Sequence, residues 1–104
     1  MIFEQRTYRL RAGTVRDYLR TYEQEGGLEL QKKYLGRLVG YFHTEVGPLN
    51  EIVHLWAYES FEDREARRSA LSADPAWQAY APKIFQFIET QESKLLKPAS
   101  FSPG

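Results

Sequence analysis

The sequence predicts an α+β protein with a ferredoxin-like βαββαβ order and an antiparallel sheet. Two observations predict this class. Strand-like segments occur at residues 2–11, within the stretch 36–60 and from about residue 85 to residue 96. Helical spacing separates them at residues 14–30 and 60–82. This order is typical of a split arrangement that carries its helices on one face of the sheet, and the second half could hold two helices.

Length and composition favour one small domain covering residues 1–104, with a C-terminal tail at residues 97–104. Fourteen basic residues balance fourteen acidic ones, so no net charge attracts nucleic acid. No run approaches the roughly 18 apolar residues of a membrane span, and residues 1–6 do not read as a signal peptide. The chain has no cysteine, which excludes disulfides and thiolate chemistry. We therefore expect a cytoplasmic protein with no nucleic-acid partner and no membrane span.

The first predicted strand, residues 2–11, has two mixed faces. One side carries Ile2, Glu4, Arg6, Tyr8 and Leu10. The other side carries Phe3, Gln5, Thr7 and Arg9. Because neither side is purely apolar, the pattern favours an edge strand or a strand that faces a dimer partner.

A capping-box-like pair, Thr14 and Asp17, predicts the start of the first helix, because a hydroxyl and a carboxylate can satisfy unpaired backbone donors. Apolar residues follow at helical spacing: Val15, Tyr18, Leu19 and Tyr22. Gly26–Gly27 costs a helix about 1 kcal/mol per glycine relative to alanine. We expect a break there and a short resumed turn through Leu30.

The second half opens with another cap, Ser60 followed by Asp63, which predicts a helix through Leu71. Asp74–Pro75 predicts a further helix, with aspartate as the cap and proline at the first helical position, where its missing donor does no harm. Pro82 is expected to end or bend that helix. The last strand is expected from about Phe85 through Leu95 or Leu96.

The stretch from Gly36 to Ser60 predicts a hairpin around a Gly-Pro-Leu-Asn turn. Its apolar face is expected under the helices and carries Leu38, Gly40, Phe42, Thr44, Val46, Val53, Leu55 and Ala57. Its mixed face suits a lined cavity or a wet interface and carries Val39, Tyr41, His43, Glu45, Ile52, His54, Trp56 and Tyr58. A four-residue loop would pair Glu45 with Ile52, His43 with His54, and Tyr41 with Trp56.

Several spaced motifs across the chain resemble the NIPSNAP family of the dimeric α+β barrel superfamily. They are Glu4-x-Arg6-Thr7-Tyr8, Leu38-Val39-Gly40-Tyr41-Phe42, Gly47-x-x-Asn50, His54-Leu55-Trp56-x-Tyr58, the arginine-rich helix around Arg64 and Arg68, Asp74-Pro75-x-Trp77-x-x-Tyr80 and Pro98-x-Ser100-Phe101. The resemblance implies a ferredoxin-like fold and a homodimer whose two sheets form a barrel. It implies no shared catalytic residue set. Relatives with the same barrel include cofactor-free monooxygenases, isomerases and haem enzymes, which is an analogy at the level of the fold.

We place the candidate ligand pocket on the mixed face. Its expected residues are Arg6, Tyr8, Tyr41, His43, Glu45, His54, Trp56 and Tyr58. The candidate catalytic residues are His54, His43 and Arg6. In such a site a histidine would act as the base, an arginine would stabilise a developing oxyanion, and the aromatic rings would stack on the substrate.

Three other readings of these residues stay open. His43, Glu45 and His54 could form a two-histidine, one-carboxylate metal site, although no short ligand motif is present. A histidine could ligate haem. In the resembling haem enzymes the ligand generally lies on a helix, whereas both histidines here fall on predicted strands. Arg64, Arg67 and Arg68 could contact an anion or could form a solvated helix face paired with nearby acids. Our expectation is no metal and no cofactor.

The leading functional hypothesis is a homodimer that binds a small aromatic or hydrophobic molecule, with cofactor-independent monooxygenase or isomerase-like chemistry as its enzymatic form. The alternative is a non-catalytic dimeric interaction module in which the mixed face fills the barrel. The two differ in whether Tyr41, His43, His54, Trp56 and Arg6 line a cavity that is connected to solvent.

Overall fold

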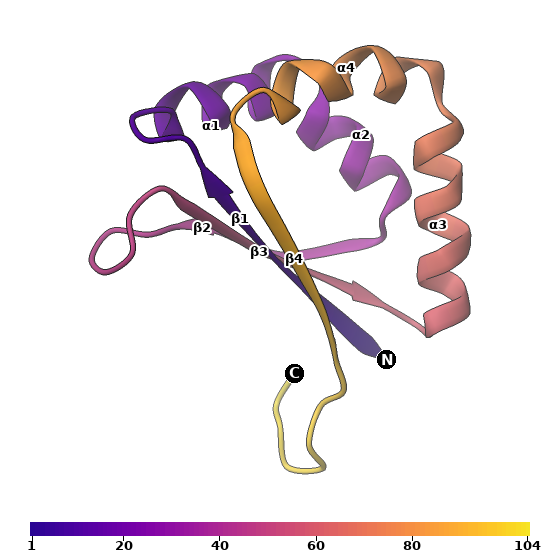
Figure 1. Ribbon diagram of the computed structural model, residues 1–104. Helices are drawn as coiled ribbons and strands as arrows, with labels where there is room; N and C mark the ends of the chain where they lie inside the picture. Colours follow the sequence, from indigo (N-terminus) through magenta and orange to yellow (C-terminus); the bar gives the residue numbers. More distant parts are fainter.

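The computed structural model describes residues 1–104 and confirms the α+β class (Figure 1). Its elements are β1 (Ile2–Leu10), α1 (Val15–Gln24), α2 (Gly27–Tyr34), β2 (Arg37–His43), β3 (Glu51–Tyr58), α3 (Phe61–Ala73), α4 (Pro75–Phe85) and β4 (Ile88–Leu96). Helix α2 is longer than the expected turn through Leu30. Helix α4 continues past Pro82 to Phe85, so this proline does not end it. None of the helices combines the length and the apolar composition needed to cross a membrane.

The four strands form one antiparallel sheet in the order β2-β3-β1-β4. Strand β1 lies inside the sheet and pairs with β3 on one side and β4 on the other. The expectation that residues 2–11 form an edge strand is therefore wrong. The charged residues that suggested an edge, Glu4 and Arg6, bond to each other in the interior, and Glu4 also accepts from Arg64 of helix α3.

All four helices lie on one side of the sheet, with α1, α2 and α4 across its top and α3 along its flank (Figure 1). The mixed face of the hairpin lies under them: Ile52, His54 and Trp56 are at most 1% exposed. Val39 and Phe42 are about half exposed. The expected face assignment is therefore inverted for β3. The Trp56 indole and His54 Nδ1 satisfy each other inside the protein, so these two polar groups do not need solvent.

The hairpin register also differs from the expected one. Tyr41 pairs with His54, and His43 pairs with Ile52. The connection runs from Thr44 to Asn50, longer than the four-residue loop that was expected, and Asn50 has a positive φ of 66°. An extra residue at Val39 shifts the register, so that Leu38 lies opposite Trp56 and shares the helix-covered face with Tyr41.

Two of the three predicted caps are confirmed. The Ser60 hydroxyl accepts a hydrogen bond from the Asp63 amide at 3.0 Å, and Asp74 accepts one from the Ala76 amide at 2.7 Å. The prediction for Thr14 is wrong in its chemistry. Thr14 stands at the cap position, but its hydroxyl donates to the Arg11 carbonyl at 2.6 Å and makes no cap bond.

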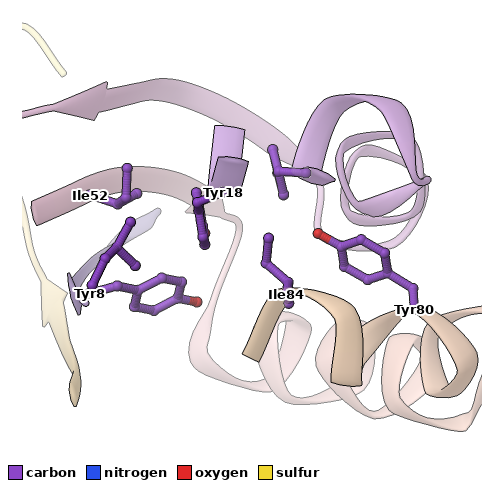
Figure 2. Close-up of a cluster of buried hydrophobic side chains, with 7 residues drawn as sticks. Tyr8, Tyr18, Ile52, Tyr80 and Ile84 are labelled. Carbon is purple, nitrogen blue, oxygen red and sulfur yellow. The ribbon is translucent and has the colours of Figure 1, made fainter. Parts of the chain in front are cut away.

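The interior between sheet and helices consists of two clusters. The larger contains Tyr8, Leu10, Tyr18, Tyr22, Ile52, Tyr80 and Ile84. In Figure 2, Tyr80 and Ile84 project from α4 toward Tyr8 and Ile52, which lie on strands of the sheet. The smaller contains Leu35, Trp56, Tyr58 and Leu71. Tyr80 lies against Gly27, where a methyl group would collide with the Tyr80 hydroxyl and force this buried ring to move, so the close packing favours glycine at that position.

Candidate functional site

A fully buried carboxylate lies at the centre of the sheet. Glu4 on β1 is 0% exposed and receives donors from β1, α3 and β4. The Oε2 atom accepts from Arg6 at 2.8 Å, from Arg64 at 2.9 Å and from the Ser93 hydroxyl at 2.6 Å. The Oε1 atom accepts from Arg64 Nε at 3.2 Å and from the Tyr58 hydroxyl at 3.3 Å. We call Glu4 and its partners Arg6, Tyr58, Arg64, Arg68 and Ser93 the Glu4 cluster. This cluster connects strand β1 to helix α3 and to strand β4.

The charge state of Glu4 follows from these contacts. Burial alone would raise its pKa, but the hydrogen bonds from Arg64 and Ser93 and the charges of Arg68 and Arg6 outweigh burial and lower the pKa to about 2. Glu4 is thus an anion at any physiological pH. It holds the three guanidinium groups in place as their shared counterion.

His54 lies beside this cluster and is 1% exposed. Its Nδ1 atom accepts a hydrogen bond from the Trp56 indole at 2.8 Å, so the proton of the neutral ring is on Nε2, which has no partner. Tyr41 stacks on the ring at 4.5 Å and Tyr8 meets it edge-on at 5.0 Å. Burial, together with the charge of Arg6, lowers the pKa of His54 to about 3. The imidazole is a neutral part of the packed interior.

A cavity of about 50 Å³ remains between the sheet and the helices, next to the Glu4 cluster. Its polar lining is Arg6, Gln31, Arg68 and Gln91. Its hydrophobic lining is Tyr8, Tyr18, Tyr22, Trp77, Tyr80, Ile84, Phe85 and Ile88. Phe85 is 48% exposed and Gln91 on the edge strand β4 is also exposed, so the cavity reaches the surface beside β4.

The hydroxyl groups around the cavity are hydrogen-bond donors. Arg6 Nε donates to the Tyr8 oxygen at 3.0 Å, which leaves the Tyr8 proton free to donate elsewhere. The Tyr80 hydroxyl is buried without a partner. Burial raises the pKa of Tyr18, Tyr22 and Tyr80 above the usual range for tyrosine. These side chains therefore stay protonated and do not act as bases. The Tyr22 hydroxyl already donates to Gln31 Oε1 at 2.6 Å and Tyr18 bonds to Tyr41, so among these three only Tyr80 has a free hydroxyl.

The structure places the sequence-predicted site residues in three settings. Arg6 and Tyr8 line the cavity. Four others share the helix-covered face but pack in the interior without lining the cavity: Tyr41, His54, Trp56 and Tyr58. His43, at the end of β2, and Glu45, in the following loop, are exposed.

The residues of the alternative metal site do not come together. His54 lies opposite Tyr41 and not opposite His43, and no group of three histidine, aspartate or glutamate side chains could hold a metal ion. The arginines of α3 were expected either to contact an anion or to pair with nearby acids on a solvated helix face, and the structure shows both kinds of contact. Arg67 makes a local pair with Asp63 at 2.9 Å, whereas Arg64 and Arg68 reach Glu4.

Sequence reasoning missed most of the cavity lining. From the sequence, Tyr18 and Tyr22 belong to an apolar helix stripe, Trp77 and Tyr80 to a family motif, and Glu4 to a mixed strand face. One signal was present: the stripes of α1 and α4 use tyrosine and tryptophan where leucine or isoleucine would fill a dry core. Aromatic residues with a polar tip at helical spacing indicate a helix face that covers polar groups.

An antiparallel sheet of this order with all its helices on one face defines a ferredoxin-like α+β protein. The chain belongs to the NIPSNAP family, whose model matches residues 3–103. The NipSnap homolog of Dictyostelium discoideum is 36% identical over 97 residues, which is 93% of this chain and 42% of that protein. The chain therefore spans less than half the length of that relative.

Solved structures agree with this assignment. A NIPSNAP family protein from Agrobacterium tumefaciens, described as having unknown function, is 54% identical with a TM-score of 0.95, covering 99% of this chain and 92% of that chain. SnoaB from Streptomyces nogalater, a cofactor-independent oxygenase, has a TM-score of 0.64 at 10% identity and covers 99% of this chain and 97% of that chain. This second likeness shows the fold alone.

Proposed function

We propose that this NIPSNAP protein is a homodimer that binds a small molecule in the cavity between its sheet and its helices. Of the five residues that were expected to separate this proposal from the interaction module, only Arg6 lines the cavity, so the mixed face of the hairpin does not support binding. The observation that supports the proposal is the cavity itself, which has aromatic walls and two arginines, whereas the interior of a small domain normally packs with few voids. The aromatic or hydrophobic part of a ligand would contact aromatic rings such as those of Tyr8 and Trp77. Its polar end would meet Arg6 and Arg68.

The cavity volume limits the ligand. A buried water needs roughly 10–15 Å³ of such space, whereas pockets for drug-sized molecules measure about 300–1,000 Å³. A cavity of about 50 Å³ accepts a molecule of a few heavy atoms. A larger ligand would extend through the opening beside β4, where Phe85 and Gln91 lie.

The proposal concerns binding first and catalysis second. Cofactor-independent chemistry of the kind named for SnoaB would need reactive groups at the cavity, and His43 and His54 do not line it. Of the candidate catalytic residues only Arg6 does. An oxygenase or isomerase-like reaction here would depend on Arg6 and on the tyrosine hydroxyls.

A blocked cavity tests the proposal. We expect members of a panel of small aromatic and aliphatic compounds, both neutral and charged, to raise the melting temperature of the wild type. Gln91→Trp places an indole at the opening and should abolish this response. Glu89→Trp is the matched control, because Glu89 is exposed on the same strand but does not line the cavity. If no compound stabilises the wild type, the non-catalytic interaction module becomes the better account.

The open face of the sheet supports the homodimer. It carries a groove of about 580 Å³ lined by Phe3, Val39, Leu55, Leu96 and residues of the 97–104 tail. Val39 and Phe42 are 48% and 57% exposed, and apolar patches of this kind mark interaction sites. A second copy of the same face would cover them in an isologous contact.

The absence of cysteine keeps the cytoplasm as the expected compartment.

Sedimentation velocity at micromolar concentration should give a dimer mass for the wild type. Phe42→Glu should give a monomer, because it puts a charge into the proposed interface. Phe61→Glu is the control, since Phe61 is 50% exposed but lies on α3, away from the open face. A wild-type monomer at this concentration would overturn the dimer proposal.

A further inference from the structure

We infer that the cavity recognises a carboxylate, so that its ligand is a small monoanionic organic acid held by Arg6 and Arg68. This inference deepens the proposed function and rests on it. The two arginines come from different elements, Arg6 from the sheet and Arg68 from α3, and both line the cavity. Guanidinium groups match the planar geometry of a carboxylate.

Arg68 has unused bonding capacity. Its Nη1 atom lies 3.5 Å from Glu4 Oε1 without forming a hydrogen bond, and this buried atom has no other partner. Arg64, by comparison, donates to both oxygens of Glu4. Because a buried charged donor without a partner is costly, an anion in the cavity would satisfy what Glu4 leaves unpaired.

The charges around the cavity favour a single negative charge on the ligand. Three arginines meet at Glu4, and Arg64 also pairs with Glu65 at the surface. Three guanidinium groups against two carboxylates leave one positive charge without a counterion. A monoanion would neutralise it, whereas a dianion would leave an excess negative charge in a partly buried site.

The remaining lining suits the body of such an acid. The free proton of Tyr8 can donate to a carboxylate oxygen beside Arg6, since the Tyr8 oxygen already accepts from Arg6. Trp77 and Ile84 offer apolar contact on the helix side. No acidic side chain lines the cavity, and the charge of Glu4 next to it is already paired with arginines.

Paired ligands that differ only in charge test the inference. Acetate, propionate and benzoate are compared with acetamide, propionamide and benzamide by NMR titration of the wild-type protein. We expect each acid to bind at least tenfold more tightly than its amide, because a charge-assisted hydrogen bond is stronger than a neutral one. Equal affinities would overturn the carboxylate inference and leave the proposed small-molecule function standing. Binding of none of the six would overturn both.

A matched pair of arginine variants assigns the effect to Arg68. Arg68→Gln should weaken the acids at least tenfold and leave the amides unchanged. Arg67→Gln removes a neighbouring arginine that pairs with Asp63 and does not line the cavity, and it should bind the acids like the wild type. Equal acid affinity in the two variants would contradict the role of Arg68. The comparison of acids with amides in the wild type holds even if Arg68→Gln folds poorly.

Discussion

Glu4→Gln should lower the free energy of unfolding by about 3–5 kcal/mol, the range for removing one partner of a buried ion pair. The side chain keeps its size but loses its charge. Arg6, Arg64 and Arg68 would then face one another around a neutral amide in a site where Glu4 is 0% exposed. The amide group would also place an N–H where one of these donors now finds an acceptor.

Urea unfolding of Glu4→Gln and Glu65→Gln measures this effect against a matched control. Glu65 also pairs with Arg64, but its side chain is 53% exposed. We expect Glu65→Gln to cost less than about 1 kcal/mol, as surface ion pairs do. Similar losses for the two variants would mean that the Glu4 cluster does not hold the fold together.

Acidification should destabilise the protein by about 2 kcal/mol between pH 7 and pH 5, with His54 as the main cause. The pKa of His54 is lowered to about 3 in the folded state, against 6.5 when unfolded. Below pH 6.5 the unfolded chain therefore takes up a proton that the folded protein does not, and stability is lost as the pH falls toward 3. Glu4, with its pKa lowered to about 2 from 4.5, adds a further loss below about pH 4.5.

Urea unfolding at pH 5, 6 and 7 tests this dependence. His54→Gln should flatten the profile in this range, because glutamine does not titrate and its amide oxygen can still accept from the Trp56 indole. His43→Gln is the control, since His43 is exposed at the end of β2, and it should follow the wild-type curve. A wild-type stability that does not change from pH 7 to pH 5 would contradict a buried, neutral His54.

The element order could be predicted from the sequence because its signals are local. Ser60 and Asp74 mark helix starts through bonds to amides two or three residues away, and Gly26–Gly27 separates α1 from α2. The hairpin register could not be predicted. It depends on the longer connection from Thr44 to Asn50 and on the extra residue at Val39, and neither leaves a clear pattern in the sequence.

The candidate site could be predicted only in part. Arg6 and Tyr8 were among the expected pocket residues, and both line the cavity. The expectation that the mixed face of the hairpin forms a lined cavity or a wet interface was wrong for Tyr41, His54 and Trp56. Tyr41 bonds to Tyr18 and Trp56 bonds to His54 in the interior. The role of Glu4 depends on Arg64 and Ser93, which lie far along the chain and meet it only in the folded sheet.

The two tryptophans offer the most direct measurement of ligand binding in the cavity. Trp77 lines the cavity, whereas Trp56 is fully buried in the smaller cluster and does not line it. In an ¹⁵N-edited NMR titration with propionate, which has five heavy atoms, we expect a saturable shift of the Trp77 indole resonance with little change at Trp56. Gln91→Trp should remove the Trp77 shift. A Trp77 resonance that stays in place at the highest propionate concentration, or an equal movement of both indoles, would contradict binding in this cavity.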